Sequence, residues 1–407
     1  MSATRATGRG LWGQALVLSL AAAVSLGVTR FAYGLLLPPM RQALDWSYTL
    51  AGAMNTANAV GYLLGALLMP RLLKRWSPGR VLGAGMALAA VFMALSGFMT
   101  DAGSLLVQRL LAGWASALVF VTGGLLAAGL AQQRPQQGGW LIGLYYGGTG
   151  WGIVASALVV PWVLTQPTDW PRAWWALAGV CALALLALWP TVAQLDHQRT
   201  QAGATARDDG VRFQLSQWWL GLAGYGCFGV GYIGYMTFVI ALLREQGASS
   251  ATVTGFYAAL GLAVVASARL WARLLDHFKG GQALAILNAL LALATVVPAL
   301  AAPPWALALS GLLFGAVFLS VVASTTVMVR HNLPTQEWAR GISAFTIVFA
   351  LGQIVGPTLV GWVADGPGGL ERGLACSAAV LLLGAALAWG QRPLSRQAAG
   401  HSASGLK

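Results

Sequence analysis

Long apolar runs separated by short polar stretches recur along the whole chain. They cover residues 12–39, 48–70, 81–100, 104–130, 140–164, 173–194, 217–242, 252–274, 282–301, 304–329, 341–364 and 373–390. Runs of about 18 residues or more can cross a hydrocarbon core roughly 30 Å thick. Runs this long and this uniformly apolar are typical of helices, which satisfy their own backbone groups in lipid, and not of barrel strands. The pattern predicts an all-α integral membrane protein with twelve transmembrane helices.

Composition and charge agree with that prediction. Of the 407 residues, 57% are apolar and 9% are charged, whereas soluble domains carry about 25% charged residues. The net charge of +13 raises the question of nucleic-acid binding, but most Lys and Arg residues fall in every second loop. Such asymmetry orients a protein in a membrane. It predicts that both termini are cytoplasmic in a bacterial-type inner membrane, and it argues against a nucleic-acid partner.

Cysteines and histidines argue against an enzyme or a metal protein. Each of the three cysteines lies alone in a different predicted span, and the histidines fall in loops or in the tail: Cys181, Cys227, Cys376, His197, His277, His331 and His401. Neither metal-ligand spacing nor a membrane-embedded nucleophile and base can be assembled from them. The chain also lacks a GxxxxGK[ST] phosphate loop, so nucleotide hydrolysis is not expected. We expect neither catalysis nor a cofactor.

The two halves of the sequence resemble each other. GVTRFAY at 27–33 aligns with GVGYIGY at 229–235, RLLKRW at 71–76 with RLLDHF at 273–278, and RLLAG at 109–113 with GLLFG at 311–315, always at an offset of 202 residues (27 to 229, 71 to 273, 109 to 311). With six spans per half, both halves insert the same way up. The sequence predicts two parallel six-helix repeats, at residues 1–193 and 214–390, joined by a cytoplasmic linker at 194–213 and followed by a cytoplasmic tail at 391–407.

Six plus six spans around a cytoplasmic linker resemble the major facilitator superfamily. The loop after the second span usually reads GxLaDRxGRR there; here it reads MPRLLKRWSPGR, with Lys74 in place of the acid and Arg75 beside it, while ARLLDHFKGG in the second half keeps the acid as Asp276. Arg109 and Gly113 match the RxxxG of the fourth span. GVTRFAYGLLLPPM followed by NAVGYLLGALL is similar to the YbfB/YjiJ-type branch. The resemblance implies a secondary transporter whose halves rock about a midplane site, with a gating role for Lys74, Arg75 and Asp276.

Two arginines, Arg30 and Arg109, lie inside predicted spans. A charged side chain near a helix centre costs roughly 2.5–3.5 kcal/mol even on a lenient scale, so it needs a partner or a wet cavity. All eleven acids fall in loops or at span ends, so no carboxylate is available at the same depth. An anionic cargo could complete the site, because guanidinium matches carboxylate and phosphate groups. Arg109 can equally be a structural link between helices, and Arg30 can instead stack on tyrosines.

Other candidates for substrate contact surround these arginines. Asn55 and Asn58 share one helix face, where they either line a cavity or bond across helices. The offset of the two halves pairs Arg30 with Tyr232 and Tyr33 with Tyr235. This suggests an asymmetric site, in which the first half holds the anionic head of a substrate and the second half contacts its uncharged body. The predicted substrate-binding set is Arg30, Tyr33, Asn55, Asn58, Arg109, Tyr232, Tyr235 and Gln353.

The sequence therefore predicts a secondary transporter that moves a small organic anion, such as a monocarboxylate or an aromatic acid, by alternating access. Protons are a candidate second partner, and we expect a monomer. An exporter of drug-like or sugar-like compounds is the first alternative, since the second half is rich in aromatic residues. A transporter-shaped sensor that moves no solute is the second alternative.

Overall fold

The structure, a computed structural model, describes residues 8–199, 214–300, 303–334 and 337–394. The elements of its first half are α1 (Gly8–Ala22), η1 (Ala23–Phe31), α2 (Tyr33–Leu44), α3 (Tyr48–Leu73), α4 (Pro78–Ser96), α5 (Ala102–Gln133), η2 (Pro135–Gln137), α6 (Gly138–Val163), η3 (Pro167–Asp169) and α7 (Trp170–Arg199). Those of its second half are α8 (Leu215–Glu245), α9 (Ser250–Leu270), α10 (Ala272–His277), α11 (Gln282–Val296), η4 (Val297–Leu300), α12 (Pro304–Asn332), α13 (Trp338–Ala364) and α14 (Gly369–Trp389).

Twelve segments of the described chain are long and apolar enough to span a membrane, which confirms the predicted all-α fold. The first span is composite, because it runs through α1, η1 and α2 between Gly10 and Leu44. The eighth span ends earlier than predicted: α9 stops at Leu270, and the Trp271 indole after it donates to the Ala316 carbonyl at 2.8 Å. Helix α7 continues to Arg199, into the first part of the segment that the sequence assigned to the linker.

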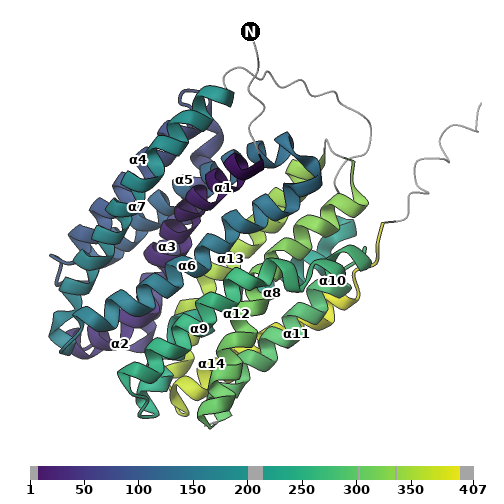
Figure 1. Ribbon diagram of the computed structural model, residues 1–407. Coiled ribbons are helices and arrows are strands. Elements are labelled where there is room, and N and C mark those ends of the chain that lie inside the picture. The colour runs from purple at the N-terminus through teal and green to yellow at the C-terminus, as the bar shows by residue number, and fades with distance from the viewer. Residues whose placement is uncertain (1–7, 200–213, 301–302, 335–336, 395–407) are drawn as a thin grey trace, which may run out of the picture.

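The helices of the two halves form two neighbouring bundles, seen in Figure 1 as the purple-to-teal group and the green-to-yellow group. The halves meet where α3 packs on α13, α6 on α9, and α2 on α8. We call the end of the molecule where α7 ends and α8 begins the linker end, and the other the opposite end. Close helix approach at the interface depends on glycine: a Cβ placed on Gly52 of α3 would lie 2.2 Å from the Pro357 carbonyl oxygen of α13.

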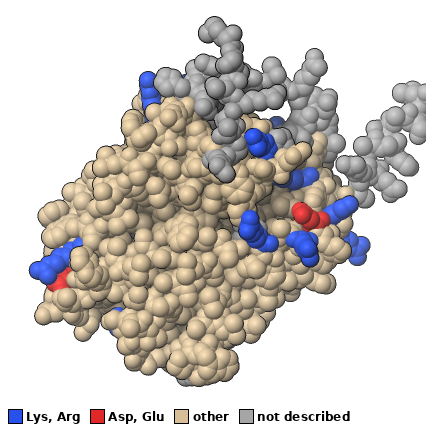
Figure 2. Space-filling view, in the orientation of Figure 1, with Lys and Arg blue, Asp and Glu red and all other residues tan. Residues whose placement is uncertain are grey.

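Charged side chains gather toward the two ends of the molecule. Figure 2 shows a broad uncharged middle, with blue side chains most numerous toward the linker end. An uncharged belt between charged ends is what a bilayer requires, because charge in hydrocarbon is costly. Exposed tryptophans add to this picture, since Trp162, Trp305 and Trp362 are among the most exposed large side chains and indoles prefer the membrane interface.

Hydrogen bonds between the two halves cluster toward the opposite end in the described chain. Thr56 of α3 donates to the Ile354 carbonyl of α13 at 2.7 Å, and the Asn55 amide donates to Thr237 Oγ1 of α8 at 2.8 Å. At the linker end, the Arg269 guanidinium of α9 stacks over the Trp140 ring of α6 at 3.4 Å. The opposite end is therefore the more firmly closed of the two.

Candidate functional site

Arg30 lies in η1, a π-helical stretch of nine residues in the middle of the first span. Its side chain is only 2% exposed, and its Nε and Nη2 atoms are buried without a hydrogen-bond partner. The nearest ring under its guanidinium is that of Tyr62 from α3, 6.0 Å from Cζ to the ring centroid. Leaving buried donors of a charged group unpaired is costly, so the described residues compensate this guanidinium only in part.

Aromatic side chains from both halves surround Arg30. Tyr62 of the first half and Tyr232 of the second both lie close enough to be influenced by its charge. Tyr146 of α6 interacts with Tyr62 and packs against Phe120 at 5.5 Å between ring centroids. The Tyr146 side chain is 38% exposed. We call Arg30, Tyr62, Phe120, Tyr146 and Tyr232 the central cluster.

The second half contributes a wall of nearly parallel rings next to the central cluster. Tyr232 stacks on Phe228 at 4.7 Å, and Phe228 in turn lies parallel to Phe349, with 9° between their planes. On the other side, Tyr232 and Phe318 are tilted by only 8° at 6.1 Å. The Tyr232 hydroxyl makes no hydrogen bond with the described residues. The wall is therefore apolar apart from the Tyr232 hydroxyl, and its members Tyr232, Phe228 and Phe318 are almost fully buried.

Arg109 of α5 is also buried, with 1% of its surface exposed, but it has protein partners. Its Nη1 donates to the Thr29 carbonyl at 2.8 Å and its Nη2 donates to Asn55 Oδ1 at 3.2 Å. Its Cζ atom also lies 5.0 Å from the Tyr33 ring centroid and 5.5 Å from that of Trp174. Arg109 lies near enough to Arg30 to repel it. Its Nε atom is buried without a partner, while the other two guanidinium nitrogens face a carbonyl and an amide.

The predicted asparagines and Tyr33 form a network with Arg109. Asn58 donates to the Arg109 carbonyl at 3.2 Å and keeps a buried Oδ1 without a partner. Asn55 bridges the halves by accepting from Arg109 and donating to Thr237. The Tyr33 hydroxyl donates to the Ala51 carbonyl at 2.9 Å. These residues brace the first span against α3 and α5.

The remaining two substrate-binding candidates are Tyr235 and Gln353, and neither forms a hydrogen bond with Arg30. Tyr235 pairs its hydroxyl with Ser310 Oγ at 2.8 Å within the second half and stacks on Phe314 at 4.0 Å. Gln353 is buried on α13, and its side chain has no hydrogen bond with the part of the chain that the structure describes. The described contacts of these two residues do not include the Arg30 guanidinium, so their contact with substrate stays a prediction.

Carboxylates in the described chain lie at helix ends or between helices. Asp208 and Asp209 are outside the described residues; the others are Asp45, Asp101, Asp169, Asp196, Glu245, Asp276, Glu337, Asp365 and Glu371. The two ion pairs seen among described residues, Arg172 with Asp169 and Arg340 with Glu337, join neighbours at such ends. No described carboxylate therefore neutralises Arg30.

At the opposite end, Asp365 after α13 caps the start of α3. Its carboxylate oxygens accept from the backbone N–H of Tyr48 at 2.7 Å, from that of Thr49 at 2.8 Å, and from the Thr49 hydroxyl at 2.6 Å. Burial alone would raise the pKa of this carboxyl, but the hydrogen bonds from Thr49 and Tyr48 lower it below its ordinary value. An anion at a helix N-terminus is stabilising, so Asp365 ties the halves together while it is ionised.

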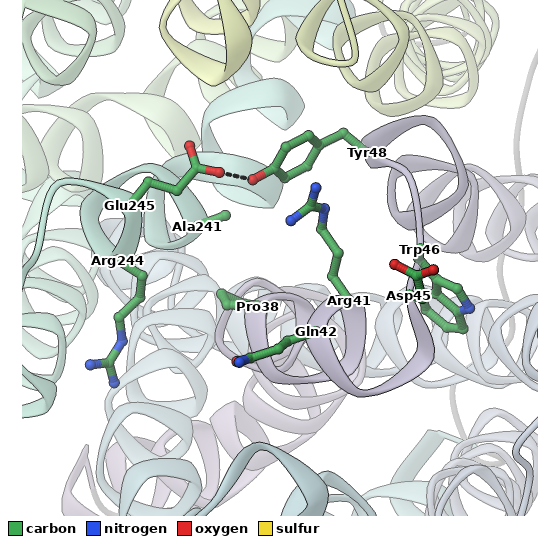
Figure 3. Close-up of a pocket in the computed structure, with 9 residues that line it drawn as sticks. All are labelled: Pro38, Arg41, Gln42, Asp45, Trp46, Tyr48, Ala241, Arg244 and Glu245. Carbon is green, nitrogen blue, oxygen red and sulfur yellow. Dashed lines mark hydrogen bonds between the residues drawn. The ribbon is translucent and has the colours of Figure 1, made fainter.

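A cavity of about 430 Å³ lies beside this tie, lined by Pro38, Arg41, Gln42, Asp45, Trp46, Tyr48, Ala241, Arg244 and Glu245. Figure 3 shows the Tyr48 hydroxyl bonded to the Glu245 carboxylate and the Arg41 guanidinium next to the Tyr48 ring. The Arg41 Cζ atom lies 3.8 Å from that ring centroid. Arg41 and Tyr48 come from the first half and Glu245 from the second, so the cavity belongs to the closed end and is separate from the central cluster.

The predicted gating residues lie at the linker end. Lys74 and Arg75 follow α3, Asp276 lies in α10, and all three are exposed. None of them forms an ion pair with another described residue. Nearby, Asp196 of α7 bonds Ser77 and the Gly79 N–H at the start of α4, which fixes the first-half loop within its own bundle.

The comparison with protein families identifies the chain. The family described as uncharacterised MFS-type transporter YbfB matches residues 22–389. The chain belongs to this family. The transporter is also similar to the inner membrane transport protein YdhP of Escherichia coli K12, with 24% identity over 351 residues that cover 83% of this chain and 86% of YdhP. These findings confirm the resemblance to the major facilitator superfamily, and the family consists of transporters and not of enzymes.

Solved structures of other transporters share the fold. A mutant of the nucleoside transporter NupG has a TM-score of 0.71 at 15% identity, covering 93% of this chain and 98% of its own. A bacterial homologue of the human lysosomal transporter Spinster has a TM-score of 0.70 at 15% identity, covering 94% and 97% of the two chains. At this identity the likeness concerns the fold, which is that of a twelve-span multi-pass membrane protein.

Some further residues of the site could have been chosen from the sequence, and others could not. Tyr62 shares a helix face with Asn55 and Asn58, which was a usable signal for its place beside Arg30. Thr29 and Phe31 act through their carbonyls, which no residue type reveals. Tyr257, whose hydroxyl bonds the Phe31 carbonyl from the other half, gave no signal beyond being a tyrosine in a span.

Proposed function

We propose that this transporter moves a small organic anion of the carboxylate type across a bacterial inner membrane by alternating access. The single observation that carries the proposal is the state of Arg30, which is buried and has two guanidinium nitrogens without a partner. A carboxylate would accept from such a fork in bidentate fashion. The carboxylate of the cargo then neutralises the positive charge of Arg30.

The two buried arginines take different roles in this proposal. Arg109 already donates to a carbonyl and an amide, so we assign it the support of the first span and leave contact with the anion to Arg30. Its positive charge nevertheless adds to the potential at Arg30, which favours an anion in the space between them. Asn55, Asn58 and Tyr33 extend this support.

The wall of rings suggests the shape of the cargo. Tyr232 stacks with Phe228 and Phe318, and an aromatic cargo would join these rings as they repack around it. Aromatic pairs gain about 0.5–1.5 kcal/mol beyond simple burial. A planar ring carrying one carboxylate would place its charge at Arg30 and its body on this wall. Benzoate is the simplest probe of that kind.

We propose that the linker end faces the cytoplasm, together with both termini. The bias of Lys and Arg toward this end supports that orientation, and YdhP is named as an inner membrane protein. Lys74, Arg75 and Asp276 lie at the end that must close when the site turns outward, which supports their gating role. For the coupling ion we propose a proton that is transported together with the carboxylate.

The second candidate function is export or uptake of an uncharged drug-like, sugar-like or nucleoside-like compound. The aromatic wall would bind such molecules, and NupG, which shares the fold, is a nucleoside transporter. An uncharged cargo would not explain why two nitrogens of the Arg30 guanidinium are buried without a partner. A cargo lacking a negative charge would be insensitive to the charge at position 30, which separates the two functions experimentally.

Uptake of radiolabelled benzoate into proteoliposomes tests the proposal. Wild-type protein should accumulate label, Arg30→Lys should retain part of the activity because the charge stays, and Arg30→Gln should lose it. Arg172→Gln, which removes an exposed arginine at a helix end, is the matched control and should transport normally. Transport of benzoate by Arg30→Gln at the wild-type rate would contradict the proposal; transport of uridine but not benzoate would favour the second candidate.

A further inference from the structure

The main chain on both sides of Arg30 is held by side chains from outside its own helix. The Thr29 carbonyl accepts from Arg109 Nη1 at 2.8 Å, and the Phe31 carbonyl accepts from the Tyr257 hydroxyl at 2.7 Å. Arg109 belongs to α5 in the same half, whereas Tyr257 belongs to α9 in the other half. Both donors are fully buried. The segment that carries Arg30 is therefore held on both sides of this residue. One of the two hydrogen bonds comes from Tyr257 in the second half, which moves relative to the first during alternating access.

These carbonyls are available because the helix is irregular at this point. Ala32, between η1 and α2, donates its N–H to the Gly27 carbonyl five residues back at 3.1 Å, and Leu35 N–H donates to the Ala32 carbonyl at 3.0 Å. In a regular α-helix, Leu35 N–H would instead donate to Phe31. The break directs the Phe31 carbonyl to the Tyr257 hydroxyl, and a carbonyl without a partner inside a membrane protein would be costly.

Close packing keeps Tyr257 against the first span. A Cβ placed on Gly34, at the start of α2, would lie 3.6 Å from the Tyr257 hydroxyl oxygen and 2.7 Å from the Met236 carbonyl oxygen of α8. A glycine at this position is what allows α2 to approach the α8 backbone this closely, while the Tyr257 hydroxyl lies at ordinary van der Waals distance. The bond to Phe31 thus depends on the contact between the halves that closes the opposite end.

We propose that Tyr257 is a positioning residue that couples closure of the opposite end to the orientation of Arg30. While that end is closed, the phenol holds the break at Ala32 and keeps the Arg30 guanidinium directed at the central cluster. When the halves swing apart at that end, α9 withdraws, and Leu35 N–H is the donor left to satisfy Phe31. The helix then becomes regular across Ala32, which turns Arg30 and weakens its hold on the anion. This inference rests on the proposed function.

Tyr257→Phe tests the coupling because it removes one hydroxyl and keeps the ring. Tyr145→Phe is the matched control: Tyr145 is equally buried, and its hydroxyl donates to the Phe120 carbonyl at 2.8 Å within one half. Both variants should lose the same amount of thermal stability. We expect benzoate affinity, measured by titration calorimetry, to fall about fivefold in Tyr257→Phe, as for one buried hydrogen bond, and to stay within twofold in Tyr145→Phe.

A measurement without ligand separates this inference from the proposed function. Spin labels on cysteines at the exposed positions 168 and 251, in a chain with its three native cysteines replaced, report the distance between the halves at the opposite end. Tyr257→Phe should shift the population toward longer distances, and Tyr145→Phe should not. Failure of wild-type protein to bind benzoate would reject the carboxylate cargo only. Unchanged distances in Tyr257→Phe, or equal shifts in both variants, would overturn the coupling.

Discussion

Arg30→Met and Arg109→Met are the same substitution at two arginines that are both almost completely buried, yet the structure predicts opposite effects on stability. Arg30→Met removes a charge whose Nε and Nη2 have no partner. Arg109→Met removes a charge that donates to Thr29 and Asn55. The pair therefore distinguishes an arginine kept for a ligand from an arginine that supports the fold.

The magnitudes follow from the partners. An unsatisfied buried polar group costs about 1–3 kcal/mol and a charged one more, so an apolar side chain of similar length at position 30 should stabilise the unliganded protein by about 1–3 kcal/mol. Loss of Arg109 deletes two hydrogen bonds from a charged donor and leaves the Thr29 carbonyl and the Asn55 amide oxygen unpaired. We expect it to destabilise the protein by about 3–5 kcal/mol.

Thermal unfolding of the purified proteins in detergent, with and without benzoate, measures both effects. Benzoate at about 100 times its dissociation constant should stabilise wild-type protein by about 2.7 kcal/mol and should leave Arg30→Met unchanged. Arg172→Met, on the surface, serves as the control for the substitution itself. The reasoning is refuted if Arg30→Met lowers the midpoint as much as Arg109→Met does, or if its midpoint still rises with benzoate.

Four further predictions concern the closed end and the cargo. Asp365→Asn weakens the cap on Thr49 and the start of α3 by about 1 kcal/mol, so cysteine labelling at the opposite end should increase about fivefold; no increase would show that the cap does not hold the halves. Hydrogen bonding lowers the pKa of Asp365, so its stabilisation is complete above its ordinary pKa and lost only as the pH falls below about 4. The spin-label distance between the halves at the opposite end should therefore be constant from pH 8 to pH 5, and a change in that window would contradict the assignment. A Cβ on Gly361 would lie 2.3 Å from the Tyr48 carbonyl oxygen, so Gly361→Ala should hold the opposite end open in spin-label measurements, whereas a wild-type distance distribution would disprove the steric argument. Unlabelled benzoate should inhibit uptake of radiolabelled benzoate at a concentration about two- to tenfold lower than cyclohexanecarboxylate does, as stacking on Tyr232 predicts. Equal inhibition by the two acids would exclude a role for the aromatic rings of the wall.

The spans and the place of Arg30 could be predicted from the sequence because both depend on composition along one segment. Apolar runs determine helices in lipid whatever their neighbours are, and a lone arginine in such a run is conspicuous. The absence of a carboxylate beside Arg30 among the described residues could likewise be deduced from the positions of the acids. That part of the reasoning needed no knowledge of which helices touch.

The roles of individual contacts could not be predicted, because they depend on backbone geometry and on distant segments. Arg109 binds a carbonyl that exists as an acceptor because η1 is π-helical, and no residue type in that stretch signals a π-helix. Asp365 caps a helix that begins 317 residues earlier in the chain. The link from Tyr257 to Phe31 likewise joins two halves whose register only the folded molecule defines.

Diffraction from crystals grown with 4-bromobenzoate tests the central claim most directly, because the anomalous signal of bromine locates the ligand and its orientation. The account predicts a carboxylate about 3 Å from Arg30 Nε or Nη2, with the brominated ring against Tyr232. Bromine density in the opposite-end cavity alone, or a guanidinium of Arg30 bonded to protein carbonyls with no ligand beside it, would contradict the claim that the cargo supplies the missing negative charge.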